Sequence, residues 1–230
     1  MLTKVGVLAA LLIPLAEEFP AQQLVALIVA TSFAAGLNIY ATVGTLGLLG
    51  HYHVLGLPPG LQLLSHWWVI AISLVLFAIE FFADKIPAFD LIWNALHTFV
   101  RVPAAALLAY RATAQLTPTQ QILVTTIGGL IALAAHGGKT AARAAVTPSP
   151  EPLSNFALSM GEDVTAVGLT WLATQHPFAA AGVVVVGLVI VIVLIRWVLR
   201  ALQALFRGAE HRLEGTPQGS AAGPAATTGT

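Results

Sequence analysis

The sequence predicts an all-α, polytopic membrane protein built as a bundle of about six transmembrane helices. Its 230 residues are 57% hydrophobic and only 9% charged, whereas a soluble domain is about a quarter charged. Apolar segments of roughly 20 residues, the length that crosses a hydrocarbon core, recur along the chain. Lys plus Arg and Asp plus Glu balance at 10 each, so the net charge does not indicate a nucleic-acid partner. The lipid bilayer is the first partner that the composition predicts.

The two ends of the chain are predicted to lie outside this bundle. The apolar stretch 5–16 is interrupted by a proline and is too short to cross a core that needs roughly 20 residues. Residues 1–20 are therefore expected to form an N-terminal interfacial helix, and the transmembrane domain is expected to cover residues 21–206. Residues 207–230 end in a run of small uncharged side chains, which predicts a disordered C-terminal tail.

Six segments are apolar and long enough to span, namely 21–49, 66–84, 90–110, 119–136, 152–173 and 178–206. The first is longer than a membrane requires and is rich in glycine, which predicts a kink or break between Gly36 and Tyr40. Its polar residues Asn38, Tyr40 and Thr42 either open the helix at depth, as in transporters, or belong to a closely packed face. We favour packing, with Asn38 contributing a buried hydrogen bond.

The distribution of positive charge predicts the orientation of the bundle. With six spans, one side of the membrane receives the cations Lys4, Lys85, Lys139, Arg143, Arg196, Arg200, Arg207 and Arg212. The other side receives only Arg111, and translocated loops are depleted in Lys and Arg. We therefore expect both termini to be cytoplasmic.

Two of the predicted spans carry polar residues on one helical face. One stripe consists of Asp90, Asn94, His97 and Arg101, and the other consists of Asn155, Ser159, Glu162 and Asp163. Asp90 and Asn155 each lie three residues after a proline and suit the N-cap position. An isolated ion at mid-membrane depth costs about 2.5 to 3.5 kcal/mol on insertion scales. The sequence therefore predicts that Arg101 pairs with Glu162 or Asp163.

A second polar group is predicted nearer the cytoplasmic side. Glu80 and Asp84 share one helix face and Lys85 follows them, while a later helix carries its own polar face. That later face consists of His136, Lys139 and Arg143. With the two stripes, these six residues are predicted to form a polar vestibule that narrows to a buried charge cluster.

Two interpretations of the buried charges remain open. They form either a salt-bridge network that only stabilises the bundle, in a structural or partner-binding protein, or a path for an ion, a proton or an anionic solute. The second interpretation describes a small transporter or channel-like protein. Residues 22–111 and 119–207 are nearly equal in length, which fits either inverted or parallel repeats.

Catalytic chemistry has little support in the sequence. Cysteine is absent, which excludes disulfides, thiolate metal sites and thiol nucleophiles. Neither a G-x-S-x-G serine motif nor an H-E-x-x-H zinc motif occurs, so we predict no catalytic residue and no cofactor. His51 and His53, with His66 ahead of a tryptophan pair, form a candidate metal site, but their place in an outer loop is more typical of the membrane interface. Small-residue helix faces are compatible with a homo-oligomer.

Three stretches together resemble a known family. They are "GLNIYATVGTLGLLG", "ADKIPAFDLIWNALHTFVRVPAAALLA" and "GGLIALAAHGGKTAARAAVTPSPEPLSNFALSMGEDVTAVGLTWLA". Their patterns D-K-I-P-x-x-D, H-x-x-K-x-x-x-R and S-P-E-P-x-S-N-x-x-x-S-x-x-E-D resemble the bacterial membrane family catalogued as domain of unknown function 4126. The resemblance implies a multi-pass protein of the bacterial cytoplasmic membrane, and it implies no particular activity or substrate.

Overall fold

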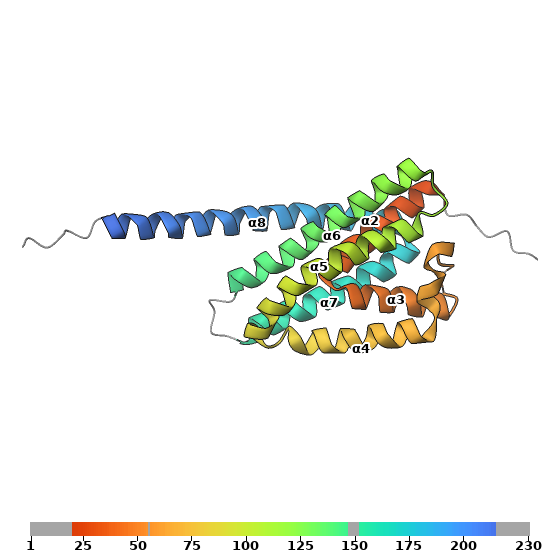
Figure 1. Ribbon diagram of the computed structural model, residues 1–230, viewed down its shortest axis with the longest axis horizontal. Helices are drawn as coiled ribbons and strands as arrows, with labels where there is room; N and C mark the ends of the chain where they lie inside the picture. Colours follow the sequence, from red (N-terminus) through yellow and green to blue (C-terminus); the bar gives the residue numbers. More distant parts are fainter. Residues whose placement is uncertain (1–19, 55, 147–151, 215–230) are drawn as a thin grey trace, which may run out of the picture.

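The computed structural model describes residues 20–54, 56–146 and 152–214. The predicted interfacial helix and most of the predicted tail lie outside these residues. Within them the chain is all-α, as predicted, and contains no strand. The helices are α2 (Ala21–Leu37), α3 (Ile39–His51), the 3-10 helix η1 (Pro59–Ser65), α4 (Trp67–Ala83), α5 (Pro87–Ala112), α6 (Pro118–Val146), α7 (Pro152–Gln175) and α8 (Pro177–Glu214) (Figure 1).

Prolines define where many of these helices start. Five of them, η1, α5, α6, α7 and α8, begin at a proline, which suits the first helical position because proline has a fixed φ and lacks the amide that would be unpaired there. Asp90 and Asn155 consequently lie inside the first turns of α5 and α7. Their predicted N-cap role is wrong, and their side chains lie outside the described residues.

The first predicted span is interrupted where the sequence predicts a break. Asn38 has an extended backbone, with φ −151° and ψ 105°, and separates α2 from α3. Its side-chain oxygen accepts a hydrogen bond from the backbone N–H of Ala41 at 2.9 Å, which caps the start of α3. The prediction of a break between Gly36 and Tyr40 is confirmed.

The chain reverses at this break instead of crossing in one direction. α2 runs beside α6 in the same direction, since Ser32 lies at Gly128 and Gly36 lies at Ala132. α3 runs antiparallel to α4, since Gly47 lies at Ile70 and Gly44 lies at Ser73. Because α4 and α6 point the same way (Figure 1), α2 and α3 point in opposite directions. The prediction that residues 21–49 cross the membrane once is therefore wrong.

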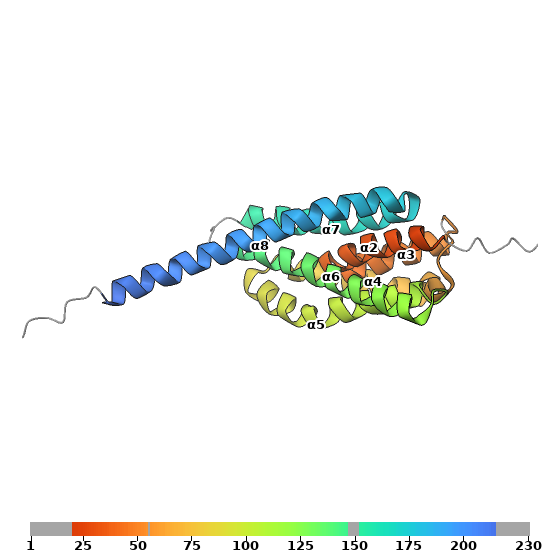
Figure 2. The same ribbon diagram turned by 90° about the horizontal axis from the view of Figure 1, so that it is seen from above.

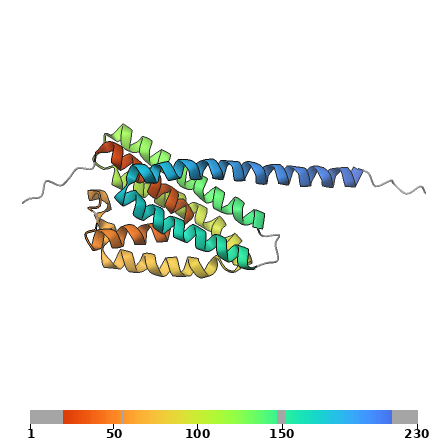
Figure 3. The same ribbon diagram turned by 180° about the vertical axis from the view of Figure 1, so that it is seen from behind.

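The bundle has two ends that the connections define. The η1 end holds η1, the α5–α6 connection and the α7–α8 turn, and the opposite end holds the α4–α5 turn (Figures 1 and 3). α2 starts at the η1 end, whereas α8 continues past the opposite end to Glu214. The first described helix thus starts at one end of the bundle and the last described helix ends at the other. The sequence predicted instead that both termini lie on the same, cytoplasmic side.

Three segments of the described residues are long and apolar enough to cross a membrane: Ile92–Ala112, Pro118–Arg143 and Pro177–Arg207. A fourth arises if η1 and α4, which are bent by 69° at their junction, are counted as one span. Large apolar side chains on these helices are exposed, among them Phe99, Val185 and Val189. Exposed apolar surfaces of this kind on helices long enough to span are typical of contact with lipid, so the chain is a helical multi-pass membrane protein.

α2 is the most enclosed helix of the bundle, and Figure 2 shows it with α3 between α7 and α5. Its buried face consists largely of small residues, including Ala30, Ala34, Ala35 and Gly36. A Cβ atom at Gly36 would lie 2.7 Å from the Cβ of Ala135. Small residues of this kind let helix backbones approach closely in a membrane. This packing brings Asn38 into the interior of the bundle.

Candidate functional site

Six charged side chains meet in the interior between α4, α5, α6 and α7. We call this set the ion-pair ladder; it consists of Glu80, Asp84, Arg101, Lys139, Arg143 and Glu162. Two helices contribute two of them each, since Glu80 lies on α4 and Asp84 is the C-cap residue directly after it, and α6 carries Lys139 and Arg143. Each of these pairs is four residues apart and so lies on one helix face. All six are buried.

Lys139 and Arg143 connect most of the ladder. The Lys139 Nζ lies 3.4 Å from Glu80 Oε1, 2.9 Å from Asp84 Oδ2 and 3.2 Å from Glu162 Oε2. The Arg143 Nη2 lies 2.9 Å from Asp84 Oδ2 and 2.7 Å from Glu162 Oε2. Each carboxylate therefore faces at least one cation, and three acids balance three bases. Such mutual compensation is what allows charges to remain in an apolar interior.

Arg101 is fully buried and pairs with Glu80. The predicted pairing with Glu162 or Asp163 is wrong, although the prediction that Arg101 meets a counter-ion is confirmed. The reason lies in the helix order, because α5 packs on α6 and α2, whereas α7 packs on α2 and α8. Equal depth in the membrane did not make these two helices neighbours.

An imidazole and an amide complete the surroundings of Arg101. Its Nη1 lies 2.9 Å from His136 Nδ1 and 3.3 Å from Asn94 Oδ1. Because a guanidinium only donates, His136 accepts at Nδ1 and carries its proton on Nε2. That nitrogen lies 2.8 Å from Thr98 Oγ1 and 3.2 Å from the Asn94 carbonyl. His136 and Asn94 therefore fix the orientation of Arg101 without adding charge.

His97 lies on the same predicted stripe but faces α3. Its Nδ1 lies 2.8 Å from the Trp93 carbonyl, which can only accept, so Nδ1 carries the proton. Its Nε2 then accepts from the Tyr40 hydroxyl at 3.1 Å. The Trp93 ring lies alongside, with ring centroids 4.3 Å apart. Tyr40 was expected near the break of the first span, but no pattern in the sequence identified it as the partner of His97.

The turn between α2 and α3 brings a neutral amide to an acid. We call this contact the tip; it consists of Asn38 and Asp163. The Asn38 Nδ2 donates to Asp163 Oδ1 at 2.8 Å, and both side chains are buried. The other carboxylate oxygen of Asp163 has no hydrogen-bond partner among the described residues. The predicted buried hydrogen bond of Asn38 is confirmed, and sequence reasoning missed that the same residue reverses the chain.

The tip adjoins the ladder and changes its charge balance. The Lys139 Nζ lies 3.4 Å from the carbonyl oxygen of Leu37, the residue before Asn38. Counting Asp163, the described buried acids number four (Glu80, Asp84, Glu162 and Asp163), whereas the described buried Lys and Arg residues number three (Arg101, Lys139 and Arg143). Asp163 thus has an amide as its hydrogen-bond partner, whereas each acid of the ladder has a cation.

Two other predicted site residues lie beside this cluster. Lys85 is outside the ladder: its Nζ donates to the Phe81 carbonyl at 2.7 Å, and Phe156 lies 5.2 Å away by its ring centroid. Ser159 is fully buried one turn before Asp163, and its hydroxyl has no hydrogen-bond partner among the described residues. The structure therefore gathers most of the predicted polar residues, and Lys85 lies outside the ladder but within electrostatic range of Asp163 and Asp84.

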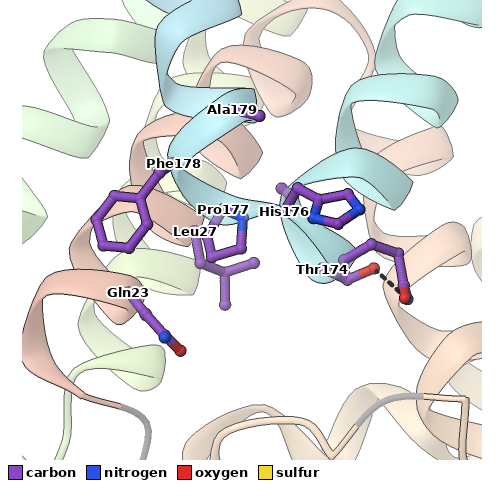
Figure 4. Close-up of a pocket in the computed structure, with 9 residues that line it drawn as sticks. Gln23, Leu27, Thr174, His176, Pro177, Phe178 and Ala179 are labelled. Carbon is purple, nitrogen blue, oxygen red and sulfur yellow. Dashed lines mark hydrogen bonds between the residues drawn. The ribbon is translucent and has the colours of Figure 1, made fainter.

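A pocket of about 370 Å³ lies at the η1 end, away from the ladder. Figure 4 shows it between the start of α2 and the α7–α8 turn, with Gln23, Leu27, His176 and Phe178 among its lining residues. None of the described residues that line it is a Lys, Arg, Asp or Glu. The charged cluster and this pocket are thus separate features.

Comparison with known proteins gives one match. The family model described as "Domain of unknown function (DUF4126)" matches residues 25–197, which is more than half of the chain. No curated protein and no solved structure matches the chain. The matched range includes every residue of the ladder and of the tip.

Proposed function

The chain belongs to the DUF4126 family, and we propose that it is a small membrane transporter or channel-like protein that moves an ion through its buried charged cluster. The family description names no activity, so the support comes from the geometry of the site. One observation carries the proposal: the helix break at Asn38 meets a buried acid that has no cation as its hydrogen-bond partner.

Discontinuous helices that end in the interior are typical of ion and substrate sites in transporters. Here the break exposes backbone and amide groups at the depth of the charges, and the Leu37 carbonyl and the Asn38 side chain contact Lys139 and Asp163. Irregular backbone is costly in hydrocarbon and is kept where it lines a functional path or is buried in protein. The α2–α3 pair is therefore the element that we expect to respond to ion binding.

The charge balance favours a cation, including a proton, over the anionic solute that the sequence also allowed. The described buried acids outnumber the described buried Lys and Arg residues by one, and each of those cations already faces an acid. A bound cation at Asp163 would balance this excess. An anionic solute bound there would instead add to the repulsion between the carboxylates.

For the membrane we propose that the candidate spans on α5, α6 and α8 and the η1–α4 pair cross, and that α7, which is not itself among the candidate spans, crosses with them. α2 and α3 then form a re-entrant pair that enters and leaves at the η1 end. This arrangement replaces the six crossings expected from hydropathy. The cations Lys85, Arg196, Arg200 and Arg207 then lie towards the opposite end, which we propose to be cytoplasmic. We propose, on the family resemblance, that this membrane is the bacterial inner membrane.

A structural role is the second candidate, and a specific observation favours it. Every described ladder cation lies within ion-pair distance of at least one carboxylate, and all six ladder residues are buried. A closed, balanced network of this kind fixes how helices pack and needs no transported ion. The two candidates make different demands on Asp163. The transport proposal needs its acidic side chain, whereas the structural role does not.

Ion flux in proteoliposomes tests the proposal. Purified protein is reconstituted, a potassium diffusion potential is set with valinomycin, and proton entry is followed with a pH-sensitive dye in the lumen. We expect flux above that of protein-free liposomes, and its loss in Asp163→Asn. The matched control is Thr170→Val on the same helix, because among the described residues the Thr170 hydroxyl bonds only its own helix, at the Ala166 carbonyl at 2.6 Å.

The outcomes separate the two candidates. Proton flux that disappears in Asp163→Asn but persists in Thr170→Val, with both variants folded, supports transport. If the unmodified protein moves neither protons nor sodium nor potassium, the transport proposal is overturned and the structural role remains. Equal flux in Asp163→Asn would remove Asp163 from the path.

A further inference from the structure

One face of α7 leads from the opposite end of the bundle to Asp163. Phe156, Ser159 and Asp163 are spaced by three and four residues, so they lie on one side of this helix. Phe156 is 46% exposed, whereas Ser159 is fully buried. The Ser159 hydroxyl and one carboxylate oxygen of Asp163 have no hydrogen-bond partner among the described residues. Two polar groups with unused oxygen atoms thus follow one another, about one helical turn apart, between the end of the bundle and the tip.

Lys85 lies at the start of this face. It belongs to the turn between α4 and α5, and its Nζ lies 5.2 Å from the centroid of the Phe156 ring. The same nitrogen donates to the Phe81 carbonyl at 2.7 Å and lies over the Phe81 ring. Among the described residues, no carboxylate lies within ion-pair distance of it. A carbonyl oxygen and aromatic faces, which attract a cation, therefore hold this ammonium group.

The charge of Lys85 is felt by the acids behind it. Burial lowers the pKa of Lys85, whereas Asp163 and Asp84 act on it in the opposite direction. Asp84 already pairs with Lys139 and Arg143, but Asp163 has only an amide as its hydrogen-bond partner. A cation without an acid as its ion-pair partner thus lies near an acid without a cation as its hydrogen-bond partner.

We propose that Lys85 is the specificity-determining residue of the ion path, because its positive charge lies where a cation enters from the opposite end. An incoming cation is repelled by Lys85 before it is attracted by Asp163, so the charge at this position sets how readily the path is loaded. A divalent ion meets twice the repulsion of a monovalent ion, and the path therefore favours ions of single charge. Lys85 can have this role only if the protein moves cations through Asp163, as proposed above.

A charge series at this position separates an electrostatic role from a structural one. Lys85→Arg keeps the positive charge, Lys85→Met removes it and Lys85→Glu reverses it. In the proteoliposome assay, the initial rate at low cation concentration should rise about three- to tenfold for each unit of positive charge removed. Lys85→Arg should remain closest to the unmodified protein. A higher concentration of an impermeant salt should reduce these differences, because Lys85 is partly exposed.

The absence of cysteine from the chain permits the same comparison on one reconstituted protein. Lys85→Cys is treated in liposomes with methanethiosulfonate reagents that attach either an ethylammonium or an ethylsulfonate group. The ammonium reagent should return the rate towards that of the unmodified protein, and the sulfonate reagent should raise it further. The matched control is Arg200→Cys, since Arg200 is an exposed cation of α8 towards the same end. Neither reagent should change its rate.

Inhibition by calcium measures the selectivity for single charge. Removing the charge in Lys85→Met should lower the calcium concentration that halves the monovalent flux, by about the square of the change in monovalent rate, because the repulsion is doubled. Equal calcium inhibition of Lys85→Met and the unmodified protein, or none of either, would overturn this selectivity.

Two further outcomes are distinct. Equal rates across the charge series, or a change of the same sign with both reagents on Lys85→Cys, would overturn the role of Lys85 while ion flux itself remained. Flux by neither the unmodified protein nor Lys85→Met would instead overturn the proposed function, and the role of Lys85 with it. If Lys85→Met does not fold, the two reagents on Lys85→Cys still decide the matter.

Discussion

The ion-pair ladder and the tip are two buried polar regions of one bundle, and their acids have different hydrogen-bond partners. In the ladder, each carboxylate lies against one or more of Arg101, Lys139 and Arg143. At the tip, Asp163 is equally buried but its hydrogen-bond partner is the neutral amide of Asn38. The comparison teaches that buried acids with similar exposure can have different partners, and it is the acid without a cation as its hydrogen-bond partner that we propose to accept an ion.

The difference has an energetic consequence. Removing one member of a buried ion pair leaves an uncompensated charge in the interior, which is costly, whereas removing both members is often nearly neutral. An acid that is bound by an amide can lose its charge and keep its hydrogen bond. We therefore expect ladder substitutions to change stability strongly and charge substitution at the tip to change it little.

The largest effect is expected for Arg101→Met. This change leaves Glu80 with only Lys139 at 3.4 Å among its described partners, and it should lower the free energy of unfolding by about 3 to 5 kcal/mol. Reversible unfolding in mixed micelles measures the loss. The double variant Glu80→Gln with Arg101→Met should be more stable than Arg101→Met alone, because it removes the unpaired charge. A single variant as stable as the unmodified protein would show that the ladder does not stabilise the bundle.

A smaller loss is expected when the close approach that positions the tip is blocked. A Cβ atom at Gly36 would lie 2.7 Å from the Cβ of Ala135 and 2.9 Å from the Cα of Ala132. Gly36→Ala must therefore push α2 away from α6, and overpacking of this kind costs about 1 to 3 kcal/mol. Gly168→Ala, which adds a methyl group in open space, is the control in the same unfolding experiment. Equal stability of the two variants would contradict the close packing of α2.

Spacing along the chain was sufficient to predict much of the ladder. Glu80 and Asp84, like Lys139 and Arg143, are four residues apart, and the prediction that each pair shares a helix face is confirmed by their ion pairs. Helix starts were less predictable, because prolines occupy first helical positions where Asp90 and Asn155 were expected to cap. Local rules thus identified the polar faces better than the exact helix ends.

Partners and chain direction could not be read from the sequence, for a physical reason. Hydropathy reports that a segment prefers an apolar environment, and a segment that enters and returns is as apolar as one that crosses. The only local signal of the reversal was the polar interruption at Asn38. The partner of Arg101 depended on which helices are neighbours, and the insertion of α2 between α5 and α7 determined that (Figure 2).

The smallest effect is expected for Asp163→Asn, and it tests the comparison most directly. The amide oxygen of the new side chain can accept the hydrogen bond that Asn38 now donates at 2.8 Å, so the contact survives while the charge is removed. We expect a change in the free energy of unfolding within about 1 kcal/mol, measured in the same micelles as Arg101→Met. A loss as large as that of Arg101→Met would mean that the charge of Asp163 compensates the ladder cations. The tip would then be part of one stabilising network, and the distinction between the two regions would disappear.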